Sequence, residues 1–82
     1  MGNNTDYFEA KAYKPKYFIG DRVIGLHEGI PFVGSVGNDR LISEIAGPEI
    51  TVHLDLPMKV ENTFCSIIVT KHKNVRPLKE LK

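Results

Sequence analysis

The chain has 82 residues, of which 41% are hydrophobic and 26% are charged, and its net charge is +1. These values fit one small globular domain with a single core, and they exclude a wholly disordered chain. The single cysteine, Cys65, excludes an intramolecular disulfide and a zinc site built from several cysteines.

The N-terminal residues carry no signal-peptide pattern, and no apolar run approaches about 20 residues. We therefore expect a cytoplasmic protein that makes no contact with a membrane. Residues 1–16 are predicted to form a flexible arm. A short helix over residues 6–13 is too brief to be stable alone and would stop before Pro15. Tyr7 and Phe8 are candidates to pack on the rest of the chain.

Two strand patterns joined by a tight turn follow the arm. Residues 20–21, Gly-Asp, form a turn dipeptide, and residues 22–28 read as the first strand because of their β-branched pair Val-Ile. Gly25 within this strand indicates a bulge or a close approach of another backbone. Residues 29–31 break the pattern, and residues 32–36 resume it as a second strand.

The central part of the chain contains the clearest strand. Residues 37–39 are predicted to be a turn, and residues 40–45 fit a short helix as well as a strand. Residues 49–56 alternate apolar and polar side chains, which places the apolar set on one face of a sheet. Pro57 is predicted to end this strand, and residues 58–62 to form the tip of a hairpin.

The C-terminal part predicts two more strands. Residues 63–70 form one, residues 71–74 a tight turn of 3₁₀ type, and residues 75–78 a short edge strand. Five short strands in about 62 residues predict an all-β fold, a small and strongly bent barrel over residues 17–79, because closure removes exposed sheet edges. Residues 80–82 remain as a tail.

Three segments resemble the SH3-like barrels, in the broad sense that includes Tudor and KOW-type modules. Gly20-Asp21-Arg22-Val23 resembles their G-D-x-V opening. Residues 29–36 resemble their G-x-x-x-x-G-x-V step into the second strand, and residues 74–78 resemble their closing 3₁₀ turn and strand. The resemblance implies a five-stranded SH3-like barrel, and it implies little about function because this barrel has many roles.

The aromatic residues indicate which kind of SH3-like barrel the chain resembles. A methyl-lysine-binding Tudor domain has a cage of several aromatics, whereas the barrel region here offers only Tyr17, Phe18, Phe32 and Phe64 and no tryptophan. The aromatic groove of peptide-binding SH3 domains is also missing. A KOW-type module, with a glycine-bearing hairpin and basic loops, fits best. The compact format with an arm also resembles small accessory proteins of tailed bacteriophages.

The sequence contains no pattern that predicts catalysis or metal binding. The three histidines, His27, His53 and His72, lack the paired spacing of metal ligands, although His53 and Asp55 could share an ion with His27. Nothing places a base beside Cys65. We expect neither an enzyme nor a bound cofactor or metal, and no small-molecule substrate.

Charge segregation predicts nucleic-acid binding as the first function. Residues 70–82 carry a net charge of +4, against −4 for residues 23–69. Clustered cations bind phosphates without regard to sequence, and tyrosines among them can stack on bases. His72 and Lys82 belong to this C-terminal cluster, and Lys11, Lys14 and Lys16 would reinforce it. The predicted contacts with DNA or RNA are Lys14, Lys16, Tyr17, Lys71, Lys73, Arg76 and Lys79.

A protein-interaction module, an adaptor or inhibitor of a larger protein, is the alternative. The acidic residues 23–69 would face a basic partner. Ile30, Pro31 and Phe32 lie at a predicted hairpin tip and are candidate apolar anchors, although Phe32 also suits the core. We expect the chain to be a monomer under either function.

Overall fold

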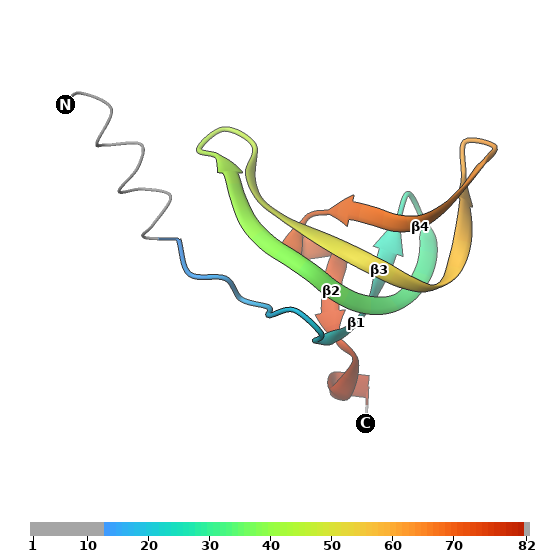
Figure 1. The fold of residues 1–82 in the computed structure, drawn as a ribbon, viewed down its shortest axis with the longest axis horizontal. Helices are drawn as coiled ribbons and strands as arrows, with labels where there is room; N and C mark the ends of the chain where they lie inside the picture. Colours follow the sequence, from blue (N-terminus) through green and yellow to red (C-terminus); the bar gives the residue numbers. More distant parts are fainter. Residues whose placement is uncertain (1–12, 82) are drawn as a thin grey trace.

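A computed structural model describes residues 13–81 of the chain, and within that range almost all regular structure is strand. The strands are β1 (Arg22–His27), β2 (Ile30–Ser43), β3 (Gly47–Val60), β4 (Thr63–Thr70) and β5 (Val75–Pro77), and two short 3₁₀ helices, η1 (His72–Asn74) and η2 (Leu78–Leu81), flank β5. The strands form one antiparallel sheet in the order β4-β3-β2-β1-β5 (Figure 1).

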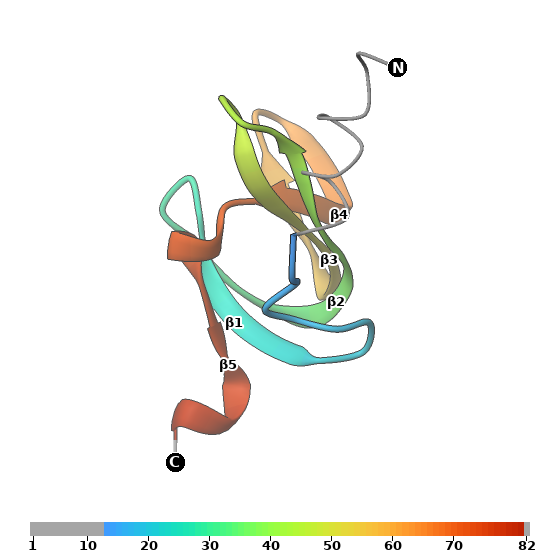
Figure 2. The same ribbon diagram turned by 90° about the vertical axis from the view of Figure 1, so that its left-hand side faces the viewer.

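This arrangement confirms the predicted all-β class with five strands. Residues 6–12 of the predicted short helix, with Tyr7 and Phe8, lie outside the described residues. The sheet is strongly bent, as Figure 2 shows, but it is not closed, because β4 and β5 are its two edges and do not pair with each other. Full closure of the barrel was therefore a wrong expectation for residues 13–81, and each edge strand keeps one unpaired side.

The long strand β2 produces the bend, because its first half pairs with β1 and its second half with β3. Gly34 lies where the two pairings overlap, opposite both Val23 and Leu54. A side chain at Gly34 would collide with the backbone carbonyl of His53. Glycine is therefore required where the sheet folds back on itself.

The predicted turn at residues 37–39 is wrong, since β2 runs through it to Ser43. The register of β2 against β3 shifts between Val36 and Asn38, so Gly37 is a bulge and not a turn. The ring of His53 fills the space where a side chain of Gly37 would lie. The bulge carries Asp39 into the interior, where it is buried.

Strand β3 also continues beyond its predicted end. It passes Pro57 and ends at Val60, and the hairpin tip is Glu61-Asn62, where both residues have positive φ. The pairing of β3 with β4 is irregular between His53 and Met58. Four residues of β3, 54–57, lie opposite the single residue Ser66 of β4. Because Pro57 cannot donate a ladder hydrogen bond, the strand bulges there instead of ending.

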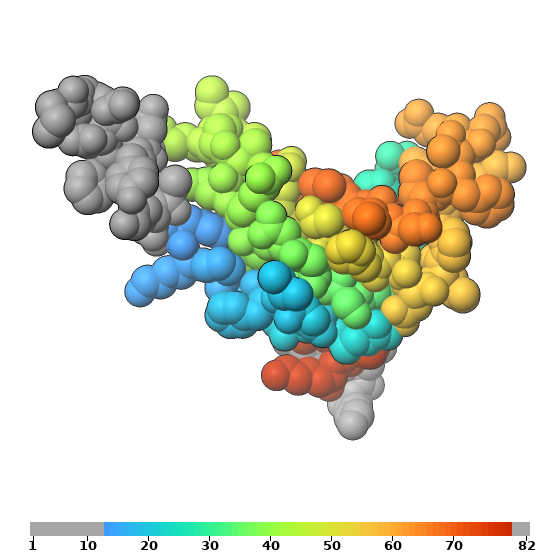
Figure 3. All heavy atoms as spheres, viewed as in Figure 1, coloured from blue at the N-terminus to red at the C-terminus, as the bar shows by residue number. Residues whose placement is uncertain are grey.

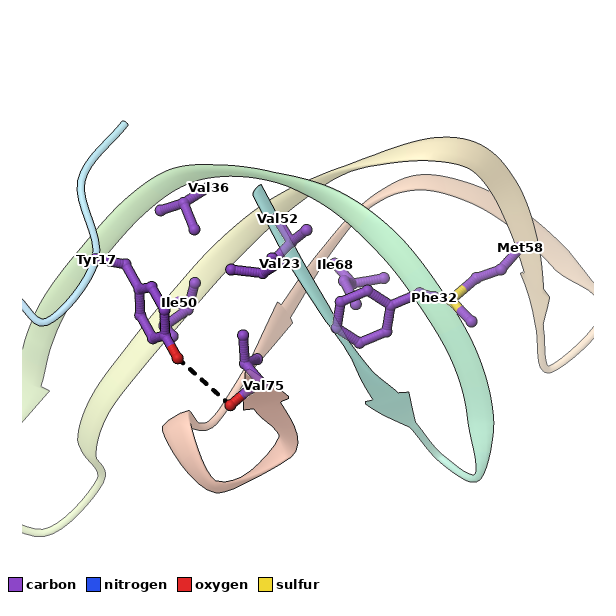
Figure 4. Packing of buried hydrophobic residues seen from close by; sticks show 9 residues of the cluster. All are labelled: Tyr17, Val23, Phe32, Val36, Ile50, Val52, Met58, Ile68 and Val75. Atoms are coloured by element: carbon purple, nitrogen blue, oxygen red, sulfur yellow. Dashed lines mark hydrogen bonds between the residues drawn. The ribbon is translucent and has the colours of Figure 1, made fainter. Parts of the chain in front are cut away.

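The core lies on the concave side of the sheet (Figure 4). The alternation in β3 correctly predicts that Ile50 and Val52 point inward, and both are fully buried together with Val23. In Figure 4, Tyr17 lies at one end of this cluster, and Phe32 and Met58 lie at the other. The full set of buried apolar residues is Tyr17, Val23, Phe32, Val36, Ile50, Val52, Met58, Ile68 and Val75.

Candidate binding groove

An open groove of about 1060 Å³ lies between the β1–β2 hairpin and the bulged part of β3. Residues of η1 and β5 also line it. The β1–β2 hairpin and the β3–β4 hairpin project at the same end of the sheet (Figure 1). Much of the lining is aliphatic and exposed, with Leu26 at 53% and Leu56 at 80%. The β3 bulge causes the exposure of Leu56, because it moves residues 54–57 out of register with β4.

Three cations surround the apolar lining. Lys59, Lys73 and Arg76 all line the groove and are all exposed. No carboxylate among residues 13–79, whose side chains the structure describes, forms a salt bridge with any of them. Their charge is therefore available to a ligand.

The groove also contains one acidic side chain, Asp55, whose charge is already compensated. Arg22 donates from Nη1 to Asp55 Oδ1 at 2.7 Å and from Nη2 to Oδ2, and it also contacts the hydroxyl of Ser35. These hydrogen bonds hold the pKa of Asp55 below its ordinary value, although burial opposes them. Asp55 remains ionised and neutralised, so the unpaired cations determine the sign of the groove's charge.

The groove brings together residues from both functions that the sequence predicts. Lys73 and Arg76 belong to the predicted nucleic-acid set, and Ile30 and Pro31 to the predicted protein-binding set. Sequence reasoning missed the wall at residues 55–59. The signal for it was Pro57 inside an alternating apolar pattern, which marks a bulge as readily as a strand end.

The remaining predicted cations lie elsewhere. Lys71 contacts Glu49 at 3.1 Å and the carbonyl of Ala46, and it does not line the groove, although its side chain is 41% exposed. Lys16 and Lys79 line a separate hollow of about 260 Å³. Lys14 is exposed and lines neither space, and Lys11 and Lys82 lie outside the described residues. The structure thus divides the predicted cationic cluster among several places.

Two predicted contact residues belong to the core. Tyr17 is 4% exposed and donates its hydroxyl to the carbonyl of Val75 at 3.4 Å, which Figure 4 shows. Its ring lies edge-on to that of His72, so it cannot stack on a base. Phe32 is 7% exposed and contributes to the floor of the groove instead of projecting as an anchor. Both rings are buried because apolar ring area gains more from burial in this small core than from solvent exposure.

The buried carboxylate of Asp39 connects segments of the chain next to the groove. The side chain of Asp39 is fully buried and accepts four hydrogen bonds. The donors to Oδ2 are the backbone N–H groups of Lys16 at 2.8 Å and Tyr17 at 2.9 Å. Oδ1 contacts the hydroxyl of Tyr13 at 2.6 Å and Nε2 of His72 at 2.8 Å. Figure 3 shows the segment that begins at residue 13, in blue, lying against β2, in green.

These contacts change the pKa values of Asp39 and Tyr13. Burial alone would raise the pKa of Asp39, but the hydrogen bonds from Tyr13, Tyr17 and His72 together lower it below its ordinary value. Burial and the Asp39 carboxylate raise the pKa of Tyr13 to about 12. Asp39 therefore joins residues 13–17, β2 and η1, and η1 carries Lys73 to the groove.

Among residues 13–79, whose side chains are described, no three or more potential metal ligands lie together. Cys65 is half-buried, and its thiol points at the carbonyl of Thr63 at 3.9 Å. None of the helices in the described range is both long and apolar enough to cross a lipid bilayer. No family model matches the chain, and no curated protein and no solved structure matches it.

Proposed function

We propose that this chain is a non-catalytic protein-interaction module whose groove binds an extended segment, with apolar and acidic side chains, of a larger protein. The observation that carries the proposal is the combination of an exposed aliphatic lining with three unpaired cations. Apolar side chains of the segment would cover Leu26 and Leu56. Its carboxylates would meet Lys59, Lys73 and Arg76.

The kind of apolar surface favours a peptide over bases. Single-stranded nucleic acid is usually held by exposed aromatic rings on which bases stack. In this groove the aromatic ring, that of Phe32, is 7% exposed, and the exposed lining is aliphatic. Aliphatic surface packs against leucine-like side chains without a preferred ring geometry. A peptide with apolar and acidic side chains can therefore contact both the aliphatic lining and the cations of the groove.

The test is binding of a labelled peptide, Glu-Leu-Asp-Leu-Glu-Pro-Leu-Asp, measured by fluorescence anisotropy. We expect the double variant Lys73→Glu, Arg76→Glu to bind at least about tenfold more weakly, because each reversal places like charges together. The matched control is Lys14→Glu, Lys79→Glu, which reverses two exposed cations outside the groove and should leave affinity within about twofold. Equal binding of a peptide with lysine at every acidic position contradicts the proposal.

Sequence-independent binding of DNA or RNA is the second candidate. It is favoured by one observation, that the exposed cations Lys59, Lys73 and Arg76 converge on one open space without carboxylate partners in the described part of the chain. A 12-nucleotide single strand and a 12-base-pair duplex should then bind at 50 mM salt and much more weakly at 200 mM. Absence of binding at 50 mM salt removes this candidate.

The finer fold assignment is part of the proposal. The bent five-stranded antiparallel sheet supports an SH3-like barrel, and the glycine-bearing β1–β2 hairpin supports the KOW type among such barrels. We propose a role as a small bacteriophage accessory protein on the compact format of the sequence.

A further inference from the structure

Strand β4 is an edge of the sheet without the usual protection of edges. It has one neighbour, β3, in the described sheet, so its outer backbone groups have no partner strand there. Its sequence, Thr63–Thr70, contains no charged residue, no proline and no glycine, and most of its residues favour strands. Soluble proteins normally interrupt such edges with lysine, proline or a bulge. Here the bulge between the two strands lies in β3.

The side chains of β4 are as exposed as its backbone edge. Phe64 is 72% exposed, and Ile67 and Val69 are each 51% exposed. Their neighbours across the sheet do not cover them, because Ile67 pairs with His53 and Val69 with Thr51. An uncharged edge with exposed apolar side chains is suited to pair with another strand.

We propose that β4 pairs antiparallel with β4 of a second copy of this chain, in a two-fold symmetric dimer that continues the sheet. Two-fold dimers are the commonest oligomers, and their interface must be self-complementary. The strand has Glu61 just before it and Lys71 just after it. Antiparallel pairing places the acidic end of one copy beside the basic end of the other, whereas parallel pairing would place like charges together.

The charges around this edge are compatible with the dimer. Lys71 is bound to Glu49 of its own chain, with its side chain 41% exposed, so it retains access to a second carboxylate. Lys59 lies opposite Phe64 on β3 and so is one strand farther from the edge. No residue of β4 lines the groove. The dimer is therefore independent of the proposed peptide binding and would present two grooves, which increases avidity for a repeated ligand.

Sedimentation equilibrium from about 5 to 500 µM tests the proposal. We expect the wild-type mass to rise to that of a dimer, and Ile67→Lys to remain a monomer with an unchanged circular dichroism spectrum. The matched control Ile42→Lys adds the same charge at an exposed isoleucine of β2 and should leave dimerisation unchanged. A wild-type chain that is monomeric at 500 µM overturns the proposal, as does an Ile67→Lys chain that dimerises like wild type.

A second variant keeps the test valid if Ile67→Lys does not fold. Glu61→Lys lies in the exposed turn outside the strand and should weaken dimerisation about fivefold, because it places two cations together in the antiparallel arrangement. Unchanged dimerisation of this variant rejects antiparallel pairing. Hydrogen exchange provides the independent readout: alternate amides of β4 should exchange more slowly at 500 µM than at 5 µM, and equal rates contradict the dimer.

Discussion

Replacement of Asp39 by asparagine tests whether one buried carboxylate holds the N-terminal segment and η1 on the sheet. The substitution keeps the shape of the side chain but removes its charge. It also forces the amide nitrogen to donate where a carboxylate oxygen accepted. Hydrogen bonds to a charged group contribute about 1.5–3 kcal/mol and neutral ones about 0.5–1.5 kcal/mol. Each of the four contacts of Asp39 then loses about 1 kcal/mol. Because contacts to one carboxylate are not additive, we expect a total loss of about 2–4 kcal/mol.

Urea unfolding at pH 7 measures this loss, and in thermal unfolding 2 kcal/mol corresponds to a fall in Tm of at least about 8 °C. The control is Asp21→Asn, because Asp21 is exposed and accepts one backbone hydrogen bond, from Phe18 at 2.9 Å; it should cost about 1 kcal/mol or less. An Asp39→Asn chain within about 0.5 kcal/mol of wild type would refute the role assigned to this carboxylate.

The pH dependence of the same variant gives a second readout. The folded-state pKa of Asp39 is lowered, so its contribution to stability is complete above the ordinary carboxyl pKa of about 3.9 and is lost as pH falls through the folded value. Wild-type stability should therefore fall more steeply than that of Asp39→Asn below about pH 4. Parallel curves for the two chains contradict the assigned hydrogen bonds.

Further predictions concern Tyr13 and two glycines. Absorbance at alkaline pH should show Tyr13 ionising near pH 12, and its stabilising effect, complete below about pH 10, should be lost as pH rises through that value; titration at the ordinary pH of about 10 rejects the buried contact. Gly25→Ala should destabilise the fold by about 2 kcal/mol or more, because the added methyl group collides with the backbone carbonyl of Asn74. Gly37→Ala should cost less, because its methyl group meets a histidine ring that can move; equal losses for the two variants in urea unfolding contradict this difference.

The sequence predicts the fold class correctly because period-two alternation reports directly on a half-buried strand. It correctly predicts that Gly25 marks a close backbone approach, which the carbonyl of Asn74 makes. It fails at Gly37 and Pro57, where turn-like residues occur inside continuous strands. Turn chemistry and bulge chemistry use the same residues, and only pairing with a neighbouring strand decides between them.

The candidate site is predictable in part. Lys73, Arg76, Ile30 and Pro31 were all predicted, but as members of two competing sites, because sequence distance hides that η1 folds back beside the β1–β2 hairpin. The hydrogen bonds of Asp39 were not predictable, since a carboxylate after Gly-Asn is typical of an exposed turn. Its burial depends on partners more than 20 residues away.

The groove itself is tested most directly by a ¹⁵N NMR titration of the full chain with the acidic peptide named above. If the groove is the binding site, amide shifts will concentrate in residues 24–33, 55–59 and 73–76 and will be absent in the Lys73→Glu, Arg76→Glu variant. Shifts concentrated around Lys16 and Lys79, or spread evenly over the sheet, would contradict the account.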